Sequence, residues 1–401
     1  MNPFFCRAFQ CCFAVGARFL PWRTPEVYSG SGSLLRVADI LKKEGLRRPF
    51  VVASRRQCAD EHFRRLQEVL DEQDILLSVY SAVEPNPSVE TVEKIAAQYR
   101  LDRCDCFLVI GGGSPMDAAK AAAARLTRPE KTLPQLGGLL KVRRRIPTLI
   151  AVPTTAGTGS ETSIAAVVTD DHHKYSISDL CLIPRYAILD PTLSATLPPR
   201  ITAETGMDAL THAVEAYLSR YYNTARTRAR AERAVVTIFS HLERAYRDGA
   251  SLPDRAAMLQ AAFDAGAAFT RASVGNVHAI AHTLGGLYGT AHGLANAVLL
   301  PIVLEDYGAA AYPRLARLAR LARLAGLPGE SDEALAKTFI AEIRAMNARM
   351  GIPDHFDCIR EEDIPQMAAW ASSEANPVYP VPVIYDRARF MRVIERARRA
   401  A

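Results

Sequence analysis

The first half of the chain alternates short apolar runs with helix-like stretches. Five runs rich in β-branched and aromatic residues predict strands, at residues 49–54, 75–80, 106–110, 148–152 and 186–190. The third run is apolar throughout, which indicates a strand buried on both faces. Because strands that alternate with helices form βαβ units, the pattern predicts a mostly parallel, Rossmann-like α/β sheet.

The pattern changes after the proline-bracketed stretch 191–199. Beyond it the chain is rich in Ala, Leu, Arg and Glu and predicts helices, notably at residues 203–220, 224–248, 254–271, 277–284 and 334–350. Gly285 and Gly286 are expected to break the fourth of these helices. We therefore expect an α/β dinucleotide-binding domain over residues 23–195 and an all-helical metal and substrate domain over residues 196–401. Two domains also agree with the chain length, because a single core rarely grows beyond about 250–300 residues.

Residues 1–22 form an extension outside both expected domains. The first twenty residues are rich in Phe and Cys, carry no acid, and have their apolar part interrupted by Arg7. Three interpretations stay open for the extension: a targeting segment, a disordered tail, or a start site placed too early.

Composition excludes several classes of protein. Of the 401 residues 49% are hydrophobic and the net charge is only +6, which excludes a mainly disordered chain. No apolar run reaches the ~18 residues of a membrane span, so we expect no membrane partner. The excess arginine is dispersed through helix-like stretches, so we expect no nucleic acid partner. The eight cysteines include no CxxC pair, and free thiols predict a reducing, cytoplasmic location.

A glycine-rich motif directly follows the third predicted strand. It reads GGGSPMD, at residues 111–117, and leads into an alanine-rich helix. Glycines let backbone N–H groups approach an anion closely, and the N-terminus of a helix favours negative charge. Ser114, Pro115 and Asp117 also suit an ordinary helix cap, but a cap does not require three glycines. Although the motif is not GxGxxG, we interpret it as a phosphate-binding loop.

A second loop, PTTAGTGSET at residues 153–162, directly follows the fourth predicted strand. Its hydroxyl and glycine residues offer both side-chain and backbone hydrogen-bond donors, whereas the alternative is an exposed turn. Because nucleotides bind at the carboxyl edge of an open α/β sheet, two such loops after neighbouring strands reinforce each other.

A cluster of histidines lies in the helical half. Asp208 and His212 are four residues apart and share a helix face, and His278 and His282 repeat that spacing. His292 follows shortly afterwards. A single histidine among apolar residues is usually part of a core, but four with an acid predict a divalent metal site. Imidazole and carboxylate suit Fe²⁺ or Zn²⁺, and the absence of thiolate argues against a structural zinc.

These motifs, in this order, resemble the iron-dependent (group III) alcohol dehydrogenases. The resemblance rests on GGGSPMDAAK, PTTAGTGSE, GMDALTHAVE and HAIAHTLGGLYGTAHGLANA, and it covers roughly residues 25–399. The segment ASSEANPVYPVPV, at residues 371–383, is similar to a tail found in part of that family. The resemblance implies a nucleotide-binding domain and a helical domain, with metal and substrate in the cleft between them.

The resemblance also assigns residues to roles. It implies that the metal, Fe²⁺ with Zn²⁺ or another divalent ion as alternatives, is bound by Asp208, His212, His278 and His292. It implies that His282 does not bind the metal and instead belongs to a proton relay beside the substrate and the nicotinamide. It implies that the dinucleotide is lined by Asn86, Gly112, Gly113, Ser114, Asp117, Thr154, Thr155, Thr158 and Lys174.

One position departs from the family pattern. After the first predicted strand, members that prefer NAD often carry an Asp, whereas this chain has Ser54 followed by Arg55 and Arg56. Arginine binds phosphate through charge-assisted contacts, so Ser54 and Arg55 predict that NADP is tolerated or preferred over NAD. The alternative is that both arginines are solvated residues at a helix start.

The implied reaction is hydride transfer between a small alcohol, or an aldehyde in reverse, and NAD(P), with the alkoxide bound to the metal. Alternatives on the same fold are a glycerol or diol dehydrogenase and a dehydroquinate synthase-like enzyme. A further alternative is a nucleotide-binding scaffold without catalysis. The family also implies a homodimer. Phe269, Tyr288 and Tyr379 are candidates either for the substrate wall or for the core.

Overall fold

The computed structural model describes residues 2–170, 173–324 and 330–398, and these form two compact units. One unit is Pro21–Thr196, and the other combines Met1–Leu20 with Leu197–Ala401. The division between the units falls one residue beyond the boundary expected from the sequence, and the extension up to Leu20 belongs with the helical unit.

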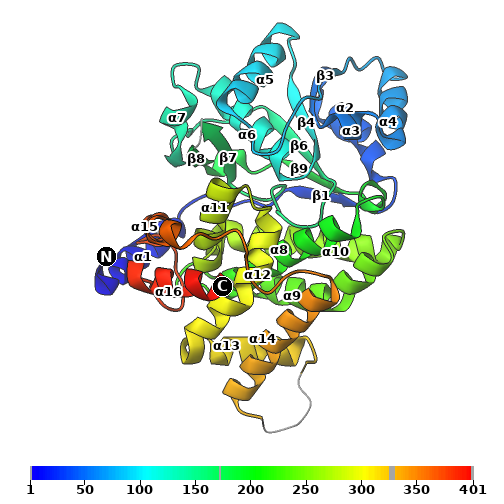
Figure 1. Cartoon of the computed structure of the whole chain (residues 1–401). Coiled ribbons are helices and arrows are strands. Elements are labelled where there is room, and N and C mark those ends of the chain that lie inside the picture. The colour runs from blue at the N-terminus through cyan, green and yellow to red at the C-terminus, as the bar shows by residue number, and fades with distance from the viewer. Residues whose placement is uncertain (1, 171–172, 325–329, 399–401) are drawn as a thin grey trace. The chain divides into compact units, whose positions relative to one another are not determined.

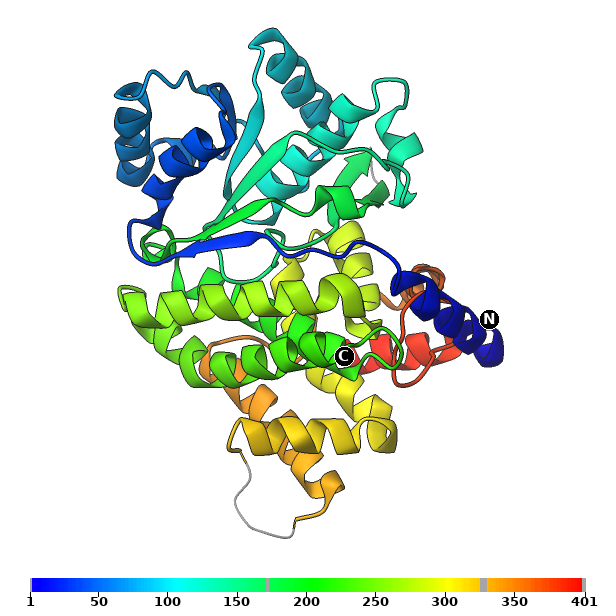
Figure 2. The same ribbon diagram turned by 180° about the vertical axis from the view of Figure 1, so that it is seen from behind.

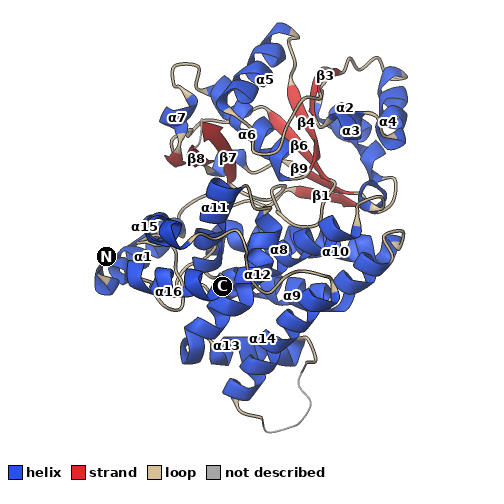
Figure 3. Ribbon diagram, viewed as in Figure 1, coloured by secondary structure: helices blue, strands red, loops and turns tan. Residues whose placement is uncertain are grey.

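Within Pro21–Thr196 the main sheet has six described strands, all parallel, in the spatial order β1-β9-β6-β4-β2-β3 (Figures 1 and 3). Their bounds are β1 Glu26–Ser29, β2 Pro49–Val52, β3 Ser78–Tyr80, β4 Cys106–Gly111, β6 Thr148–Pro153 and β9 Tyr186–Leu189. Five of the six are the strands that the apolar runs predict. The sheet confirms the expected Rossmann-like α/β class.

Both faces of this sheet are covered by helices. Phe107 and Val109 of β4 pack with α5 (Val89–Leu101) and α6 (Gly113–Thr127), whereas Leu108 and Ile110 pack with α2 (Arg36–Glu44) and α4 (Glu61–Asp71) on the other face. Every residue of β4 is buried, which is why its sequence is apolar without alternation.

The strand order places one crevice at the carboxyl edge of the sheet. From β2 the chain moves outward to β3 and then crosses to the other side of β2, where β4, β6 and β9 follow in turn. The order therefore reverses between β2 and β4. In open parallel sheets such a reversal opens a crevice at the carboxyl ends of the strands, where ligands bind.

A small second sheet holds β5 (Gly138–Leu139), β8 (His173–Ser178) and β7 (Ala165–Asp170). The sequence analysis missed these strands and β1, because they are short or carry polar residues on one face. β7 and β8 pair antiparallel, so Lys174 on β8 lies opposite Thr169.

The described residues of the second unit form helices joined by loops, with no strand among them (Figure 3). Its helices are α1 Pro3–Ala17, α8 Pro199–Leu218, α9 Ala225–Arg247, α10 Leu252–Ala272, α11 Asn276–Tyr288, α12 His292–Tyr307, α13 Tyr312–Leu321, α14 Asp332–Arg349, α15 Ile364–Ala375 and α16 Arg387–Ala397. Figures 1 and 2 both show α1 beside α15 and α16.

Two sequence expectations differ from the observed helices. Gly285 and Gly286 do not break α11, which continues to Tyr288 and ends at Gly289, whose φ of 65° is left-handed. A glycine inside a helix costs only about 1 kcal/mol, which packing outweighs here. Residues 3–17, for which disorder was one interpretation, form a helix. No single described helix has the length and hydropathy of a membrane span, although the bent pair His292–Ala310 and Tyr312–Leu321 does by length and composition alone.

Candidate metal centre and dinucleotide loops

Four of the sequence-predicted ligands come together in the helical unit. Asp208 and His212 lie on α8, His278 lies on α11 and His292 is the first residue of α12. One ligand atom from each of them lies within 4.8 Å of every other. Asp208, His212 and His278 are buried, and the side chain of His292 is 40% exposed.

Glu215 orients the imidazole of His278. Its carboxylate accepts hydrogen bonds from His278 Nδ1 at 2.6 Å and from the backbone N–H groups of Gly275 and Val277, both at 2.8 Å. In its ionised form the carboxylate only accepts, so the imidazole then carries its proton on Nδ1 and directs the lone pair of Nε2 into the cluster. A Cβ at Gly275 would lie 2.7 Å from Glu215 Oε1, so glycine is required there.

Burial sets the protonation of this pair. Desolvation, reinforced by the neighbouring imidazoles of His212 and His292, holds the pKa of His278 well below its ordinary value. The histidine is therefore neutral near pH 7, which is the form that binds a metal. Burial also raises the pKa of Glu215 to about 8, against the opposing effect of its backbone hydrogen bonds.

Asn296, one turn after His292 on α12, stands among the ligands. Its Nδ2 lies 2.7 Å from Asp208 Oδ1 and 3.2 Å from Nε2 of both His278 and His292. Gly293 explains how α12 comes so close to α8, because a Cβ there would lie 2.3 Å from the backbone oxygen of Glu204. The close approach of the two helices brings His292 within 3.5 Å of Asp208.

The donor set fits a divalent transition metal. Three imidazoles and one carboxylate, with no thiolate, suit Fe²⁺ or Zn²⁺ better than the oxygen-seeking Mg²⁺ or Ca²⁺. His282 stands apart from this set: its Nδ1 pairs with Glu374 at 2.6 Å, and its ring stacks on that of His292. That His282 does not bind the metal stays a prediction.

The three aromatic candidates for the substrate wall have separate surroundings. The ring of Phe269 stacks on that of His212, with centroids 4.3 Å apart. Tyr379 donates to Glu374 at 2.7 Å, whereas Tyr288 donates to Asp363 at 2.6 Å. Of the three, Phe269 packs directly against a candidate ligand.

In the other unit, the predicted dinucleotide loops follow β2, β4 and β6, three neighbouring strands, at the crevice where the strand order reverses. The GGGSPMD loop and the PTTAGTGSET loop are in direct contact. A Cβ at Gly112 would lie 3.1 Å from Thr155 Oγ1, and one at Gly113 would lie 3.2 Å from Thr158 Cγ2. Thr154 N donates to Gly111 O at 3.1 Å. Gly112 and Gly113 therefore let the two loops pack closely against each other.

The remaining cofactor candidates lie around these loops. Asn86 N donates to Ser114 Oγ at 3.3 Å, and Asn86 Oδ1 accepts from Lys174 at 2.9 Å. Ser54 caps the short helix α3 (Arg55–Cys58), and its capping partner Gln57 donates to Thr154 Oγ1 at 3.3 Å. Arg55 is exposed at the start of α3.

Lys120, which the sequence analysis did not single out, links α6 to the PTTAGTGSET loop and the residues that follow it. The fully buried ammonium donates to Ser160 O, Ser163 O, Ser163 Oγ and Ala165 O at 2.6–3.2 Å. Burial lowers the pKa of Lys120 and raises those of Asp117 and Glu161, while attraction between the lysine and the two carboxyls opposes each shift. Asp117 also accepts a hydrogen bond from the backbone of Val167, so its carboxyl links α6 to β7.

Replacing Lys120 tests whether its buried contacts shape the predicted dinucleotide site. We expect Lys120→Met to lower the free energy of unfolding by about 3–5 kcal/mol, because buried acids lose their counter-ion. We also expect weaker dinucleotide binding, measured by nicotinamide fluorescence. Lys94→Met, at an exposed ion pair with Glu90 on α5, is the matched control. If the Lys120→Met variant is destabilised but binds the dinucleotide with normal affinity, Lys120 contributes to stability only.

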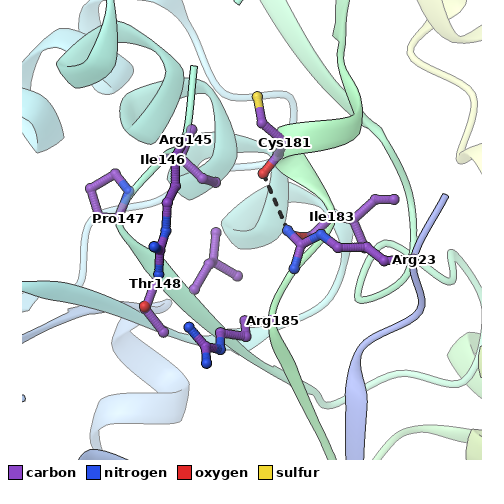
Figure 4. A pocket seen from close by; sticks show the side chains of 9 residues that line it. Arg23, Arg145, Ile146, Pro147, Thr148, Cys181, Ile183 and Arg185 are labelled. Atoms are coloured by element: carbon purple, nitrogen blue, oxygen red, sulfur yellow. Dashed lines mark hydrogen bonds between the residues drawn. The ribbon is translucent and has the colours of Figure 1, made fainter. Parts of the chain in front are cut away.

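A cavity of about 420 Å³ lies elsewhere on the same unit (Figure 4). It is lined by Arg23, Arg145, Ile146, Pro147, Thr148, Leu149, Cys181, Ile183 and Arg185. Arg23 donates to the carbonyls of Cys181 and Ile183, and Arg185 pairs with Glu44. The cavity lies at the amino ends of β6 and β9, so it is separate from the loops at the carboxyl edge.

Four residues at these sites escaped the sequence analysis: Lys120, Glu215, Asn296 and Glu374. Three of them carry a usable signal, a polar residue at helical spacing from a candidate inside an otherwise apolar helix. Glu215 is three residues after His212, Asn296 is four after His292 and Lys120 is three after Asp117. Glu374 has no such signal, because its partner His282 is 92 residues away in the sequence.

Comparisons with known proteins agree with this geometry. Residues 24–191 match the family described as iron-containing alcohol dehydrogenase, and residues 202–397 match the C-terminal part of the same family. The 1,3-propanediol dehydrogenase of Klebsiella pneumoniae is 36% identical over 366 residues, 90% of this chain and 94% of that protein. The NADPH-dependent butanol dehydrogenase of Clostridium saccharobutylicum is 34% identical, over 82% of this chain and 83% of that protein.

Solved structures give the same result. The crystal structure of a 1,3-propanediol oxidoreductase superposes with a TM-score of 0.90 at 33% sequence identity, covering 95% of this chain and 100% of that one. The matches support the main prediction and do not favour the dehydroquinate synthase-like alternative. The chain belongs to the iron-containing (group III) alcohol dehydrogenase family.

Proposed function

We propose that this enzyme interconverts short primary alcohols or terminal diols with their aldehydes, and that it uses NADP(H) at least as well as NAD(H). The reaction class is that of its family: an alcohol dehydrogenase that transfers a hydride between an alcohol or aldehyde and NAD(P). The finer choice of substrate is supported by relatives named for 1,3-propanediol and butanol. The observation that carries the proposal is the cluster of three imidazoles and a carboxylate within 4.8 Å.

Each side chain has a proposed role. Asp208, His212, His278 and His292 would hold the metal, and Glu215 fixes the ring of His278. When bound, such a metal supplies a Lewis acid that polarises an alcohol or carbonyl oxygen. His282, next to His292, takes the hydroxyl proton during oxidation and returns it during reduction.

The dinucleotide is held by the loops after β2, β4 and β6. We assign the pyrophosphate to the backbone N–H groups of Gly112, Gly113 and Ser114, at the N-terminus of α6, where the helix dipole favours an anion. The hydroxyls of Thr154, Thr155 and Thr158 supply further donors. Asn86, in the loop after β3, and Lys174, on β8, are joined by a hydrogen bond and border the same region.

Steady-state kinetics of the iron-loaded enzyme test the substrate assignment. We expect 1-propanol and 1,3-propanediol to be oxidised, and their aldehydes reduced, with a higher kcat/KM than glycerol. A preference for glycerol would instead favour the glycerol dehydrogenase alternative. The absence of NAD(P)-linked turnover with every alcohol and aldehyde would contradict the proposed function.

Arg55 is the residue that we propose to contact the 2′-phosphate of NADP. It is exposed at the edge of the crevice, whereas Arg56 already donates to Thr196 O at 3.2 Å. Arg55→Ala should lower kcat/KM for NADPH by about 10-fold or more, because a charge-assisted hydrogen bond contributes about 1.5–3 kcal/mol. The efficiency with NADH should stay unchanged. An equal loss with both cofactors, or a strong preference of the unmodified enzyme for NAD, would exclude this role.

We also infer a cytoplasmic homodimer. None of the eight cysteines is in a disulfide, which supports a reducing compartment. β1 is a mostly exposed strand at the edge of the main sheet, and such edges offer backbone groups for pairing. Light scattering of the purified protein measures the oligomeric state.

A further inference from the structure

The segment after α15 returns to meet His282. Residues 376–383, which we call the proline-rich segment, contain Pro377, Pro380 and Pro382. Tyr379 N donates to Ala375 O at 2.8 Å, so the chain turns back on the end of the helix. The turn brings the hydroxyl of Tyr379 to Glu374 Oε1, which also accepts from Nδ1 of His282.

This contact fixes the orientation of the histidine. A carboxylate accepts only, so the imidazole carries its proton on Nδ1 and has its lone pair on Nε2. Although burial tends to raise the pKa of Glu374, the positive charge that His282 takes up on protonation and the hydrogen bonds from His282 and Tyr379 outweigh it and lower that pKa. Glu374 is therefore ionised near neutral pH. The ring of His282 lies nearly parallel to that of His292, with centroids 5.3 Å apart and planes at 15°.

Helix α1 holds the proline-rich segment in place. Gln10 Nε2 donates to the carbonyls of Pro377 and Tyr379, at 3.0 and 2.7 Å. Arg7 donates to the carbonyls of Val381 and Pro382, at 2.8 and 2.9 Å. The prolines lack the N–H groups with which the segment could pair regularly, so its carbonyls need donors from elsewhere.

The docking of α1 is specific to one face. Gln10 and Cys6 are fully buried, whereas Phe4 is 81% exposed on the same helix. Burying a glutamine costs free energy unless its amide is hydrogen-bonded, so a helix that only covered apolar surface would not be expected to carry one here. α1 also precedes the segment that matches the family, which begins at residue 24.

We propose that α1 and the proline-rich segment act together to position His282 for proton transfer. In this arrangement Gln10 and Arg7 hold the segment, the segment places Tyr379 against Glu374, and Glu374 fixes the imidazole. Glu374, Tyr379, Arg7 and Gln10 are thus positioning residues for His282. The inference rests on the proposed role of His282 in alcohol oxidation.

The first experiment replaces Glu374 in the iron-loaded enzyme. We expect Glu374→Ala to lower kcat by about 10-fold to 100-fold, the usual effect of removing the partner that orients a functional histidine. Iron content and the KM for the alcohol should stay unchanged, because no ligand is altered. Glu374→Gln should recover most of the loss, since one amide oxygen can accept both bonds that Oε1 accepts now.

The second experiment tests the coupling to α1. Gln10→Ala should lower kcat by about 3-fold to 10-fold in the unmodified enzyme and should have no effect on kcat in the Glu374→Ala background, because coupled residues are not additive. The same substitution should speed amide hydrogen exchange in residues 376–383. Phe4→Ala, on the exposed face of α1, should change neither quantity. Arg7→Ala serves the same purpose if Gln10→Ala does not fold.

The outcomes separate this inference from the proposed function. If the unmodified enzyme oxidises alcohols but Glu374→Ala keeps a normal kcat, the positioning role is wrong and the function stands. If Gln10→Ala lowers kcat equally in the unmodified enzyme and in the Glu374→Ala background, α1 stabilises the protein but does not position His282. If the iron-loaded enzyme oxidises no alcohol while hydrogen exchange still reports the tie between Gln10 and the segment, the proposed function fails but the structural link holds.

Discussion

The His278→Ala variant should neither retain iron nor turn over alcohol. His278 offers one of the four candidate ligand atoms and its ring is oriented by Glu215, so its loss would open the cluster. We expect kcat to fall by at least about 1,000-fold, because a Lewis acid contributes several kcal/mol to such reactions and each 1.36 kcal/mol is a factor of ten. Metal analysis and initial rates on the same sample measure both quantities.

A histidine outside the cluster controls for this substitution. His355 pairs with Asp354 and Asp357 in the same unit and does not belong to the ligand set, so His355→Ala should keep iron and activity. Adding Fe²⁺ should raise the Tm of the unmodified protein and of the control, since a ligand that binds only the folded state stabilises it by about 4 kcal/mol at 1,000 times its Kd. A His278→Ala variant that binds iron and works normally would refute the ligand assignment.

Glu215→Ala should weaken iron binding by about 10-fold to 100-fold although Glu215 is not a ligand. The substitution leaves His278 free to rotate and removes the acceptor of the Gly275 and Val277 N–H groups. We also expect the free energy of unfolding to fall by about 3–5 kcal/mol, since three buried N–H groups lose their acceptor at a cost of about 1–3 kcal/mol each. Isothermal titration with Fe²⁺ under anaerobic conditions and denaturant unfolding measure the two effects.

A second substitution, Glu215→Gln, tests the same role of Glu215 in orienting His278. The two carboxylate oxygens accept three N–H groups between them, whereas an amide offers one oxygen and would point its own NH₂ at a donor. We therefore expect Gln to rescue little. Glu232→Gln, at a half-buried carboxylate that pairs with Arg317 and Tyr217, is the control and should bind iron normally. Wild-type iron affinity in both Glu215 variants would show that backbone packing alone orients His278.

The fold was predictable from the sequence as far as local patterns define it. β4 is apolar throughout and β6 is apolar after Thr148, because both faces of the sheet are covered there, and this made the two strands recognisable without any tertiary information. β7 and β8 were not visible, because they are half exposed and pair with each other away from the main sheet. The extent of α11 was mispredicted for a different reason. The glycines at 285 and 286 indicate a break, and only tertiary packing overrides them.

At the site, helical spacing paired Asp208 with His212, whereas the full ligand set came from the family resemblance, and neither predicted what surrounds the ligands. Asp208 with His212 could be recognised as one helix face, and the structure brings His278 and His292 to the same point. The contacts of Asn296 with α8 and α11 and of Glu374 with His282 depend on how those helices cross. Helical spacing from His292 marks Asn296 as a candidate, but a single sequence does not show which distant residues Asn296 and Glu374 contact. The interpretation of Ser54, Arg55, Asn86 and Lys174 as cofactor residues is still a prediction, supported by their grouping around one crevice.

Restoration of activity by iron tests the central claim most directly. Enzyme stripped of metal by a chelator should not reduce NADP with 1-propanol or 1,3-propanediol, and stepwise anaerobic addition of Fe²⁺ should restore the rate in proportion to bound iron, up to one ion per chain. The result that would contradict the account is alcohol oxidation at the full rate by the metal-free protein, or a fully iron-loaded protein that transfers no hydride from any alcohol.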